Sequence, residues 1–338
     1  MVIILSKLKL HLDVEKIELT WLTAKNELIF SLPFLNGVQS HYFQTYVLNP
    51  HERTRFISVF NEGVNHIQLT SVEDCDYVLL PFKWRTTALD PSDGRPSAEP
   101  YIKLAKDHGK KLLVLFEDDY DGPLNLSSDE GIVLRTSFYK SRRKSNEFAL
   151  PVFRCDRFKN NYITNKSEKP TVGFCGFFNS EAHGIRKYAL HCLEKDNRID
   201  TNYIIRDYFW AQGVAKDVAV SDHYSNITDN MFTLCSRGAG NHSMRLYEVL
   251  SMGRIPIQVD TDCVYPFENV IDWNRHCVIV PEKDIHNIST YVIDFYNSKS
   301  DTELLKMQIR NRKLWEKYLS PLGFVKNVKE AFYDSSNK

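Results

Sequence analysis

The sequence predicts an α/β protein with two domains, each built around a parallel β-sheet. The chain has 338 residues, which is enough to form two hydrophobic cores. Short apolar runs alternate with helix-like segments, a pattern typical of parallel sheets. A polar stretch rich in Asn, Lys and Ser, residues 158–170, separates the two halves as a linker would. We therefore expect domains at residues 1–160 and 170–305, followed by a helical segment at 306–338.

In the first domain, polar residues follow directly after short apolar runs. These runs predict strands at residues 27–34, 77–82, 111–116 and 131–135. Because ligands of a parallel sheet bind beyond the carboxyl ends of its strands, the residues after each run are candidates for a site. Lys83 and Arg85 follow one run, and Asp118 and Asp119 follow the next.

One segment of the second domain predicts a strand, a glycine loop, a helix and another strand in close succession. Residues 232–235 form a short apolar run of the kind that makes a buried strand. Gly238 and Gly240 then give the backbone freedom where side chains would crowd a ligand. The second strand, residues 255–259, ends at Asp260.

The helix of this segment has a defined start and end. Asn241 or Ser243 can cap its N-terminus, an apolar stripe at i, i+3 and i+4 follows, and Gly253 can terminate it. The unpaired N–H groups of the first turn and the helix dipole both favour negative charge there. The helix start is therefore a candidate anion site.

Two arginines give this helix start the character of a phosphate site. Arg237 lies in the loop and Arg245 in the first turn, so their guanidinium groups can converge on one phosphate. Glu248, three residues later, shares that helix face and can accept hydrogen bonds from a ribose. The alternative is a surface ion pair between Arg245 and Glu248, with Ser243 as a plain cap.

The same segment resembles the signature of the exostosin-type glycosyltransferases. That signature reads approximately C-x-R-G, S-x-R-L-Y-E, G-x-I-P-V and P-F-x-x-x-I-D-W. The matching residues here are Cys235, Arg237, Gly238, Ser243, Arg245, Leu246, Tyr247, Glu248, Gly253, Ile255, Pro256, Pro266, Phe267, Ile271, Asp272 and Trp273. Ser236 and Arg254 depart from it, since proline and cysteine are common at these two positions. The match covers about 50 of the 338 residues.

The resemblance implies a GT-B-type architecture, in which two Rossmann-like domains face each other and a C-terminal helix crosses back to the N-terminal domain. It implies transfer of a hexosyl or pentosyl group from a nucleoside-diphosphate sugar, with a UDP-sugar favoured, to a glycan or glycolipid acceptor. The reaction would invert the anomeric centre and need no metal or other cofactor. The expected donor-binding residues are Arg237, Gly238, Gly240, Ser243, Arg245, Glu248 and Asp260, and Lys83 and Arg85 are expected on the acceptor side.

Glycosyl transfer also needs a base for the acceptor hydroxyl, which we expect in the N-terminal domain. Asp118 and Asp119 are the best-placed carboxylates, and the sequence does not separate them. A solvated acidic turn or a helix cap is the alternative for both. Asp260-Thr261-Asp262 ends a strand and matches the D-x-D metal motif, but we assign it to closing over the donor sugar rather than to a metal.

Composition limits the partners and the compartment. Formal net charge is zero, with 43 basic and 43 acidic residues, which argues against a general nucleic-acid binder. Seven cysteines without a C-x-x-C pair favour a reducing compartment over a disulfide or zinc framework. No apolar run approaches the roughly 18 residues of a membrane span, and no signal peptide is recognisable, so a cytoplasmic protein is expected.

A basic run at residues 140–144 bears on contact with membranes. It contains Lys140, Arg142, Arg143 and Lys144. A solvated loop is one interpretation. The other is peripheral contact with an anionic acceptor, such as a diphosphate lipid, at a membrane face.

Two other classes of function stay open. A nucleotide-sugar enzyme of another kind, such as an epimerase, would be expected to carry an N-terminal G-x-G-x-x-G fingerprint, and this sequence has none. A scaffold or partner protein without catalysis would keep the donor fold. The intact Arg237, Arg245 and Glu248 count against the scaffold.

Overall fold

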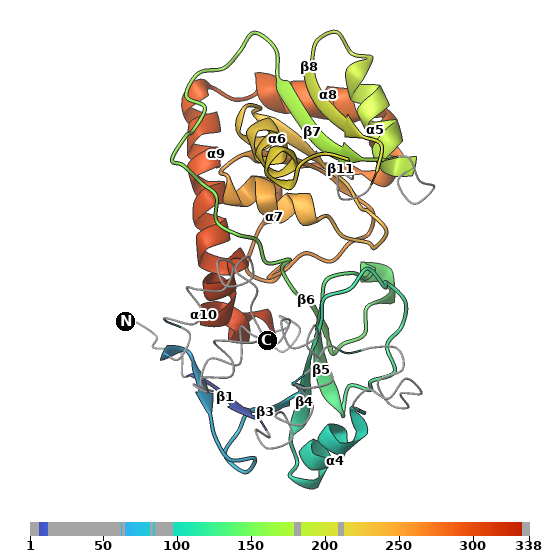
Figure 1. The fold of residues 1–338 in the computed structure, drawn as a ribbon, viewed down its shortest axis with the longest axis vertical. Helices are drawn as coiled ribbons and strands as arrows, with labels where there is room; N and C mark the ends of the chain where they lie inside the picture. The colour runs from blue at the N-terminus through green and yellow to red at the C-terminus, as the bar shows by residue number, and fades with distance from the viewer. Residues whose placement is uncertain are drawn as a thin grey trace. The chain divides into compact units, whose positions relative to one another are not determined.

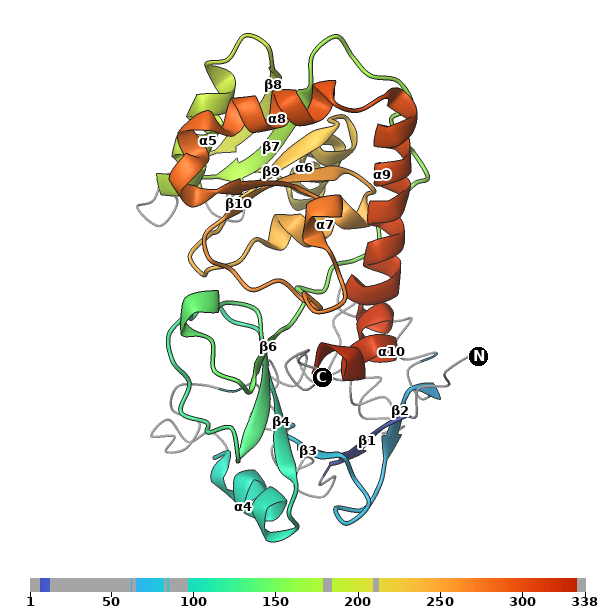
Figure 2. The ribbon, with the colours of Figure 1, turned by 180° about the vertical axis from the view of Figure 1, so that it is seen from behind.

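The computed structural model describes residues 7–12, 62, 65–81, 84, 97–178, 184–208 and 213–332. The strand predicted at residues 27–34, together with Lys83 and Arg85, lies outside these ranges. The chain divides into two compact units, which can be followed in Figure 1 and, from behind, in Figure 2. Unit 1 consists of residues 1–155 and 317–338, and unit 2 of residues 156–316.

The described part of unit 1 is built around a parallel sheet. In spatial order its strands are β2 (Ile67–Leu69), β1 (Leu8–His11), β3 (Tyr77–Leu79), β4 (Lys111–Phe116), β5 (Gly131–Arg135) and β6 (Glu147–Ala149). Every neighbouring pair runs parallel. The strands predicted at residues 111–116 and 131–135 are confirmed with those bounds, and the run at 77–82 contributes residues 77–79.

Helical segments also belong to the described part of unit 1. They are α4 (Glu99–Asp107), the short 3-10 helix η3 (Lys140–Arg142) and α10 (Pro321–Ala331). Helix α4 packs on β3 and β4 and buries Tyr101 and Ala105. Phe324 of α10 meets the ring of Phe153 edge-to-face, with centroids 5.5 Å apart. A short π-helical stretch, η8 (Trp315–Leu319), precedes α10.

Unit 2 contains a second parallel sheet. Its strands in spatial order are β11 (Val278–Pro281), β10 (Ile255–Asp260), β9 (Phe232–Cys235), β7 (Thr171–Phe177) and β8 (Asp200–Arg206). All neighbouring pairs are parallel. The strands predicted at residues 232–235 and 255–259 are both confirmed.

Both sheets have the same doubly wound strand order. Counted over the described strands of each unit, the first five lie in the order 2-1-3-4-5. In unit 2 this order reverses between β7 and β9, and ligands of such sheets bind outside the carboxyl ends of the strands at this point. Two units with parallel sheets and helices confirm the predicted α/β fold class.

Helices cover both faces of the unit 2 sheet (Figure 1 and Figure 2). On one face α5 (Gly184–Glu194) packs against α8 (Ile288–Asn297). On the other face lie α6 (Lys216–Thr228) and α7 (Met244–Ser251), and α7 packs against α9 (Asp301–Leu314). Two 3-10 helices, η6 (Trp273–Arg275) and η7 (Glu282–Asn287), lie before and after β11. Helices from opposite faces thus begin at the same edge of the sheet.

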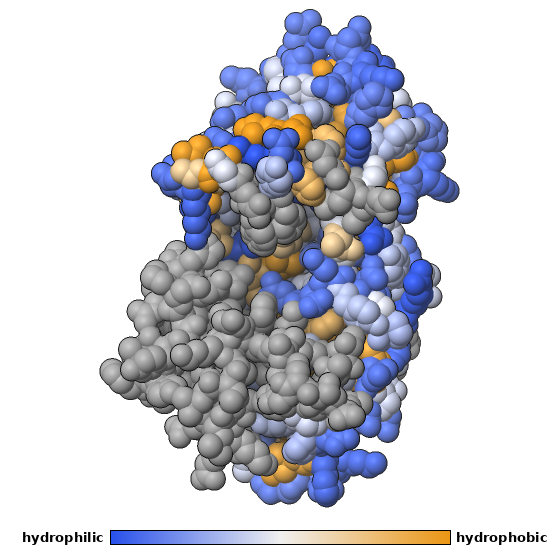
Figure 3. Space-filling model, turned by 45° about the vertical axis from the view of Figure 1, so that its right-hand side comes forward, coloured by the Kyte–Doolittle hydropathy of each residue, from blue (hydrophilic) through white to orange (hydrophobic). Residues whose placement is uncertain are grey.

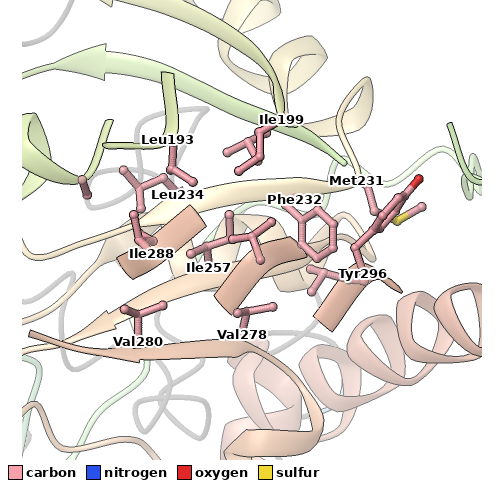
Figure 4. Close-up of a cluster of buried hydrophobic side chains, with 14 of the residues drawn as sticks. Leu193, Ile199, Met231, Phe232, Leu234, Ile257, Val278, Val280, Ile288 and Tyr296 are labelled. Atoms are coloured by element: carbon pink, nitrogen blue, oxygen red, sulfur yellow. The ribbon is translucent and has the colours of Figure 1, made fainter. Parts of the chain in front are cut away.

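The core of unit 2 lies between this sheet and the helices α5 and α8 (Figure 4). Leu234 of β9 and Ile257 of β10 are fully buried, as is Ile288 of α8. Phe232 meets Tyr296 edge-to-face, with ring centroids 6.0 Å apart. Each such side chain stabilises the fold by about 1.5–3 kcal/mol relative to exposure, so this core fixes the strand ends that carry the site.

The polar stretch predicted as a linker, residues 158–170, lies within unit 2. Gln308 of α9 bonds both backbone groups of Ile163, at 3.0 Å to its N–H and 2.8 Å to its carbonyl. Arg254, a departure from the signature, is 1% exposed and donates to the carbonyl of Asn161 at 2.7 Å. Backbone groups of this stretch are therefore hydrogen-bonded to other residues of unit 2. The domain boundaries at 160, 170 and 305 stay predictions.

The described surface is mixed in character. On the face drawn in Figure 3 most described residues are hydrophilic, and hydrophobic ones form small, separate groups. Scattered apolar side chains of this kind are normal on folded proteins. No helix within the described ranges is long and apolar enough to cross a membrane.

Candidate functional site

The start of α7 lies at the point where the strand order of unit 2 reverses. Strand β9 ends at Cys235, and α7 begins directly after Ser243. Ser243 is the N-cap residue, as predicted, although its hydroxyl makes no capping hydrogen bond. Gly253 follows the helix with a left-handed φ of +62°, so the predicted end is confirmed.

Arg245, in the first turn of α7, reaches the end of β7. Its Nη2 donates to the carbonyl of Cys175 at 2.6 Å, and its Cζ lies 4.2 Å from the centre of the Phe174 ring. Its Nε is buried without a hydrogen-bond partner. Among the described residues no carboxylate pairs with Arg245, so the alternative of an Arg245–Glu248 ion pair is wrong. A guanidinium held by a carbonyl and an aromatic face keeps its charge for a ligand.

Gly176 makes room for this arginine. A Cβ on Gly176 would lie 2.8 Å from Nη2 of Arg245, closer than side chains approach one another, and the glycine has a φ of +152°. Any other residue would therefore displace the guanidinium. The glycine belongs to β7, so its requirement for close approach appears only once the strand and α7 are packed together.

Arg186 is a second arginine at this edge, and sequence reasoning missed it. It comes from α5, on the opposite face of the sheet from α7. Its guanidinium donates to the carbonyl of Phe177 at 2.8 Å, to the carbonyl of Arg237 at 3.1 Å and to Oγ of Ser236 at 3.3 Å. It therefore joins the end of β7 to the loop after β9. Burial, and then the charge of Arg245, lower the pKa of Arg186 to about 9, which leaves it charged at neutral pH.

The loop between β9 and α7 is folded back on itself. The N–H of Gly238 donates to the carbonyl of His242 at 3.3 Å. Asn241 is 1% exposed, and its Oδ1 accepts from Thr261 Oγ1 at 2.6 Å, which ties the loop to the end of β10. The loop and the first turns of α7 bring together Arg237, Gly238, Gly240, Ser243, Arg245 and Glu248.

Glu248 lies one helical turn below Arg245 and pairs with a histidine. Its Oε2 is 2.9 Å from Nε2 of His223, which belongs to α6. The side chains of His223 and Glu248 are 22% and 12% exposed. Burial opposes the charge of the imidazole, but Glu248 and a hydrogen bond with Cys175 outweigh it and raise the pKa of His223 to about 9. The imidazolium and the carboxylate therefore coexist at neutral pH.

Asp260 ends β10 at the same edge of the sheet. Its half-buried carboxylate accepts a weak hydrogen bond from Sγ of Cys263 at 3.7 Å. Asp262 has a left-handed φ of +63°. In the described ranges no three His, Cys, Asp or Glu side chains cluster as a metal would require. Neither a metal role nor closure over a sugar is tested by this arrangement.

The acidic turn of unit 1 distinguishes the two carboxylates that the sequence left together. Oδ1 of Asp118 accepts from the backbone N–H of Tyr120 at 2.8 Å, so Asp118 forms part of the turn. Asp119 is exposed, and its carbonyl accepts from Oγ of Ser137 at 3.2 Å. The turn alternative therefore applies directly to Asp118, and Asp119 presents the more accessible carboxyl group.

A buried ion pair supports this turn. Arg135, at the end of β5, is 1% exposed and donates from Nη1 to Glu147 Oε1 at 2.7 Å. Its Nη2 donates to the carbonyls of Tyr120 and Gly122, each at 3.0 Å. The position of the acidic turn thus depends on a fully neutralised arginine.

The basic run of unit 1 is partly occupied by contacts within the unit. Arg143 donates to the carbonyl of Glu147 at 2.8 Å, and Lys144 to the carbonyl of Leu124 at 2.7 Å. Arg142 lies over the ring of Tyr139, 4.5 Å from its centre. Arg142, Arg143 and Lys144 thus contact other groups of unit 1.

Comparison with known proteins identifies the family of the chain. Residues 94–293 match the model of the Exostosin GT47 domain. The exostosin-1 homolog of Caenorhabditis elegans is 25% identical over 299 residues, which cover 77% of this chain and 75% of that protein. Human exostosin-2 is 27% identical over 106 residues, or 31% of this chain. A solved glycosyltransferase of Rickettsia africae has a TM-score of 0.41 and 14% identity over 84% of this chain and 81% of its own.

The family match covers more than half of the chain and reaches from unit 1 into α8 of unit 2. It includes both candidate carboxylates, Arg186 and the start of α7. The segment shared with human exostosin-2 amounts to 14% of the length of that protein. By this match the chain belongs to the exostosin-type glycosyltransferase family.

Proposed function

We propose that this protein is a glycosyltransferase that moves a sugar from a nucleoside-diphosphate donor, with UDP favoured, to a glycan or glycolipid acceptor. The transfer inverts the anomeric centre and uses no metal. One observation carries the proposal: Arg186 and Arg245 meet at the carboxyl ends of β7 and β9, and neither has a carboxylate partner among the described residues.

Charge at this edge suits a diphosphate. Arg245 lies in the first turn of α7 and Arg237 in the loop before it, next to the strand-order reversal. A diphosphate there would receive charge-assisted hydrogen bonds, which are about twice as strong as neutral ones. Glu248, one turn deeper in α7, would accept from the ribose hydroxyls. Asp260 would close over the sugar.

The same groups serve the chemical step. Negative charge develops on the leaving diphosphate as the glycosidic bond to it breaks, and fixed guanidinium groups stabilise that charge more in the transition state than in the ground state. The acceptor hydroxyl loses its proton to a carboxylate as it attacks the anomeric carbon. We assign that base to Asp119, because Asp119 is exposed and Asp118 is only partly so. Lys83 and Arg85 are proposed for the acceptor side.

A nucleotide panel tests this proposal. UDP, GDP and CMP, each with a matching sugar nucleotide, are titrated by calorimetry into the protein with and without EDTA. Saturable binding of one nucleoside diphosphate that survives EDTA is the expected result. Hydrolysis or transfer followed by proton NMR of the new anomeric centre then tests inversion.

Two results would contradict the proposal. Binding that is lost with EDTA would assign the diphosphate charge to a metal. Tight binding of a donor with no transfer to any of a panel of glycan and lipid acceptors, and no hydrolysis, would favour a scaffold that keeps the donor fold.

A further inference from the structure

His223 and Glu248 form an ion pair between two neighbouring helices of unit 2. His223 lies near the middle of α6, and Glu248 in the second turn of α7. Their side chains meet at 2.9 Å and are mostly buried. Glu248 is also the residue proposed to accept hydrogen bonds from the ribose. The partner of this carboxylate is therefore part of the donor site.

The surroundings of His223 decide what the pair can do. The titratable and charged groups around it come from α7, β7, β8 and α6 itself: Glu248, Arg245, Cys175, Arg206, Asp222 and Tyr224. Arg206 pairs with Asp222, so these two charges balance each other. Against the effect of burial, Glu248 raises the pKa of His223 and the positive charge of Arg245 lowers it, so both cations lie close enough to this carboxylate to interact with one another.

Glu248 lies three residues from Arg245 on one helix face, a spacing at which opposite charges attract. Without His223, the carboxylate of Glu248 would therefore be expected to pair with Arg245. An Arg245–Glu248 pair would take positive charge away from the diphosphate and turn the carboxylate away from the ribose. With His223 in place, Arg245 instead donates to the carbonyl of Cys175. The imidazolium of His223 thus keeps Glu248 and Arg245 of α7 from pairing with each other, so that Glu248 can bind the ribose and Arg245 the diphosphate.

We propose that His223 is a positioning residue of the donor site, which holds Glu248 for the ribose and leaves Arg245 for the diphosphate. This inference rests on the proposed function, because it assigns no ligand of its own. Its direct consequence is a pH dependence. Donor affinity should be highest while His223 is protonated and should fall as pH rises through about 9, the pKa that Glu248 and Cys175 give it against the effect of burial.

The test is UDP titration by calorimetry between pH 7 and pH 10 on the wild type, His223→Gln and His191→Gln. His191 is an exposed histidine of α5 in the same unit and serves as the matched control. At pH 7 we expect His223→Gln to weaken UDP binding about tenfold, the usual scale for a hydrogen bond to a charged group. Above pH 9 the wild type and His191→Gln should no longer bind UDP more tightly than His223→Gln. The difference between profiles is the readout, since it cancels titration of the nucleotide.

A merely structural role would lower the melting temperature of His223→Gln and leave the pH profiles of the wild type and His223→Gln parallel. If His223→Gln does not fold, Glu248→Gln is the second variant, and it should remove the same pH step. UDP binding that is equal in wild type and His223→Gln at every pH would overturn the inference while leaving the proposed function intact. A wild type that binds no nucleoside diphosphate would instead overturn the proposed function and this inference with it.

Discussion

The carboxyl edges of the two sheets place arginine in different surroundings. In unit 1, Arg135 is buried and neutralised by Glu147, and its Nη2 donates to two backbone carbonyls. In unit 2, Arg186 and Arg245 donate only to carbonyl and hydroxyl oxygens. The buried arginine of the first edge is therefore compensated by a carboxylate, and, among the described residues, the two arginines of the second edge are not.

This difference arises although both units have the same 2-1-3-4-5 strand order. Topology gives each unit a crevice at the edge of its sheet, but side chains decide what the crevice binds. Arg135, which is neutralised by Glu147, holds the backbone of the acidic turn. Arg186 and Arg245 have no carboxylate partner among the described residues and can therefore bind an anion. We therefore assign the acceptor base to unit 1 and the donor diphosphate to unit 2.

The largest expected effect concerns the base in unit 1. Asp119→Asn removes the proposed proton acceptor, so turnover should fall by about 10²–10⁴ while UDP affinity stays within about twofold. Initial rates and calorimetry on the same preparation separate these quantities. Asp118→Asn is the comparator, because an asparagine Oδ1 can still accept from the N–H of Tyr120. A larger rate loss in Asp118→Asn than in Asp119→Asn would reverse the assignment.

The neutralised arginine should matter for stability. Arg135→Ala leaves Glu147 buried without its main partner, which should cost about 3–5 kcal/mol of unfolding free energy. Denaturant unfolding measures it, with Arg198→Ala as the control. Arg198 is a 58% exposed arginine paired with Asp196, and its loss should change stability by less than about 1 kcal/mol.

If the Arg135–Glu147 pair only stabilises the fold, two apolar residues can replace it. The double variant Arg135→Leu with Glu147→Leu should recover most of the loss, because apolar residues of similar volume often substitute for a buried pair. If Arg135→Ala were as stable as the wild type, Arg135 would not have the structural role that distinguishes it from the arginines of unit 2.

Arg186 should act through the loop that it holds. Arg186→Lys keeps the positive charge but cannot reach the carbonyls of Phe177 and Arg237 and the hydroxyl of Ser236 together. We expect UDP affinity to fall about tenfold, with about 1–2 kcal/mol lost from stability. Titration calorimetry and denaturation provide the two values. Unchanged affinity in a folded Arg186→Lys would mean that the loop keeps its position without these bonds.

The smallest effect is expected at Gly176. In Gly176→Ala the new Cβ would lie 2.8 Å from Nη2 of Arg245, and the guanidinium has to shift. UDP affinity should fall severalfold, because an arginine displaced by a few tenths of an ångström loses hydrogen-bond geometry. Gly184→Ala is the control, since no atom lies within 4 Å of a Cβ there. Equal affinities of the two variants would show that Arg245 tolerates displacement.

Sequence patterns predicted the parts of the site that are local in the chain. The strand at 232–235 and the end at Gly253 follow from neighbouring residues and are confirmed, and of the two predicted caps, Asn241 and Ser243, it is Ser243 that occupies the N-cap position. The spacing of Arg245 and Glu248 also suggested an ion pair, which does not form because His223 takes the carboxylate.

Residues that act across the fold gave no comparable signal. Arg186 lies 50 residues before Ser236 in sequence, and one arginine on an amphipathic helix resembles any surface cation. His223 meets Glu248 only because α6 and α7 lie on one face of the sheet. The contacts of the polar stretch at 158–170 gave no signal for the same reason, since its partner Gln308 is 145 residues from Ile163.

The most direct test of the central claim is calorimetric titration of UDP, in EDTA, into the wild type, Arg245→Ala and Arg198→Ala. If the uncompensated arginines of unit 2 form a diphosphate site, the wild type and Arg198→Ala bind alike, and Arg245→Ala binds at least about tenfold more weakly. Its fold should be unchanged by circular dichroism. Equal UDP affinity in Arg245→Ala and Arg198→Ala would contradict the account, because the donor would then bind elsewhere.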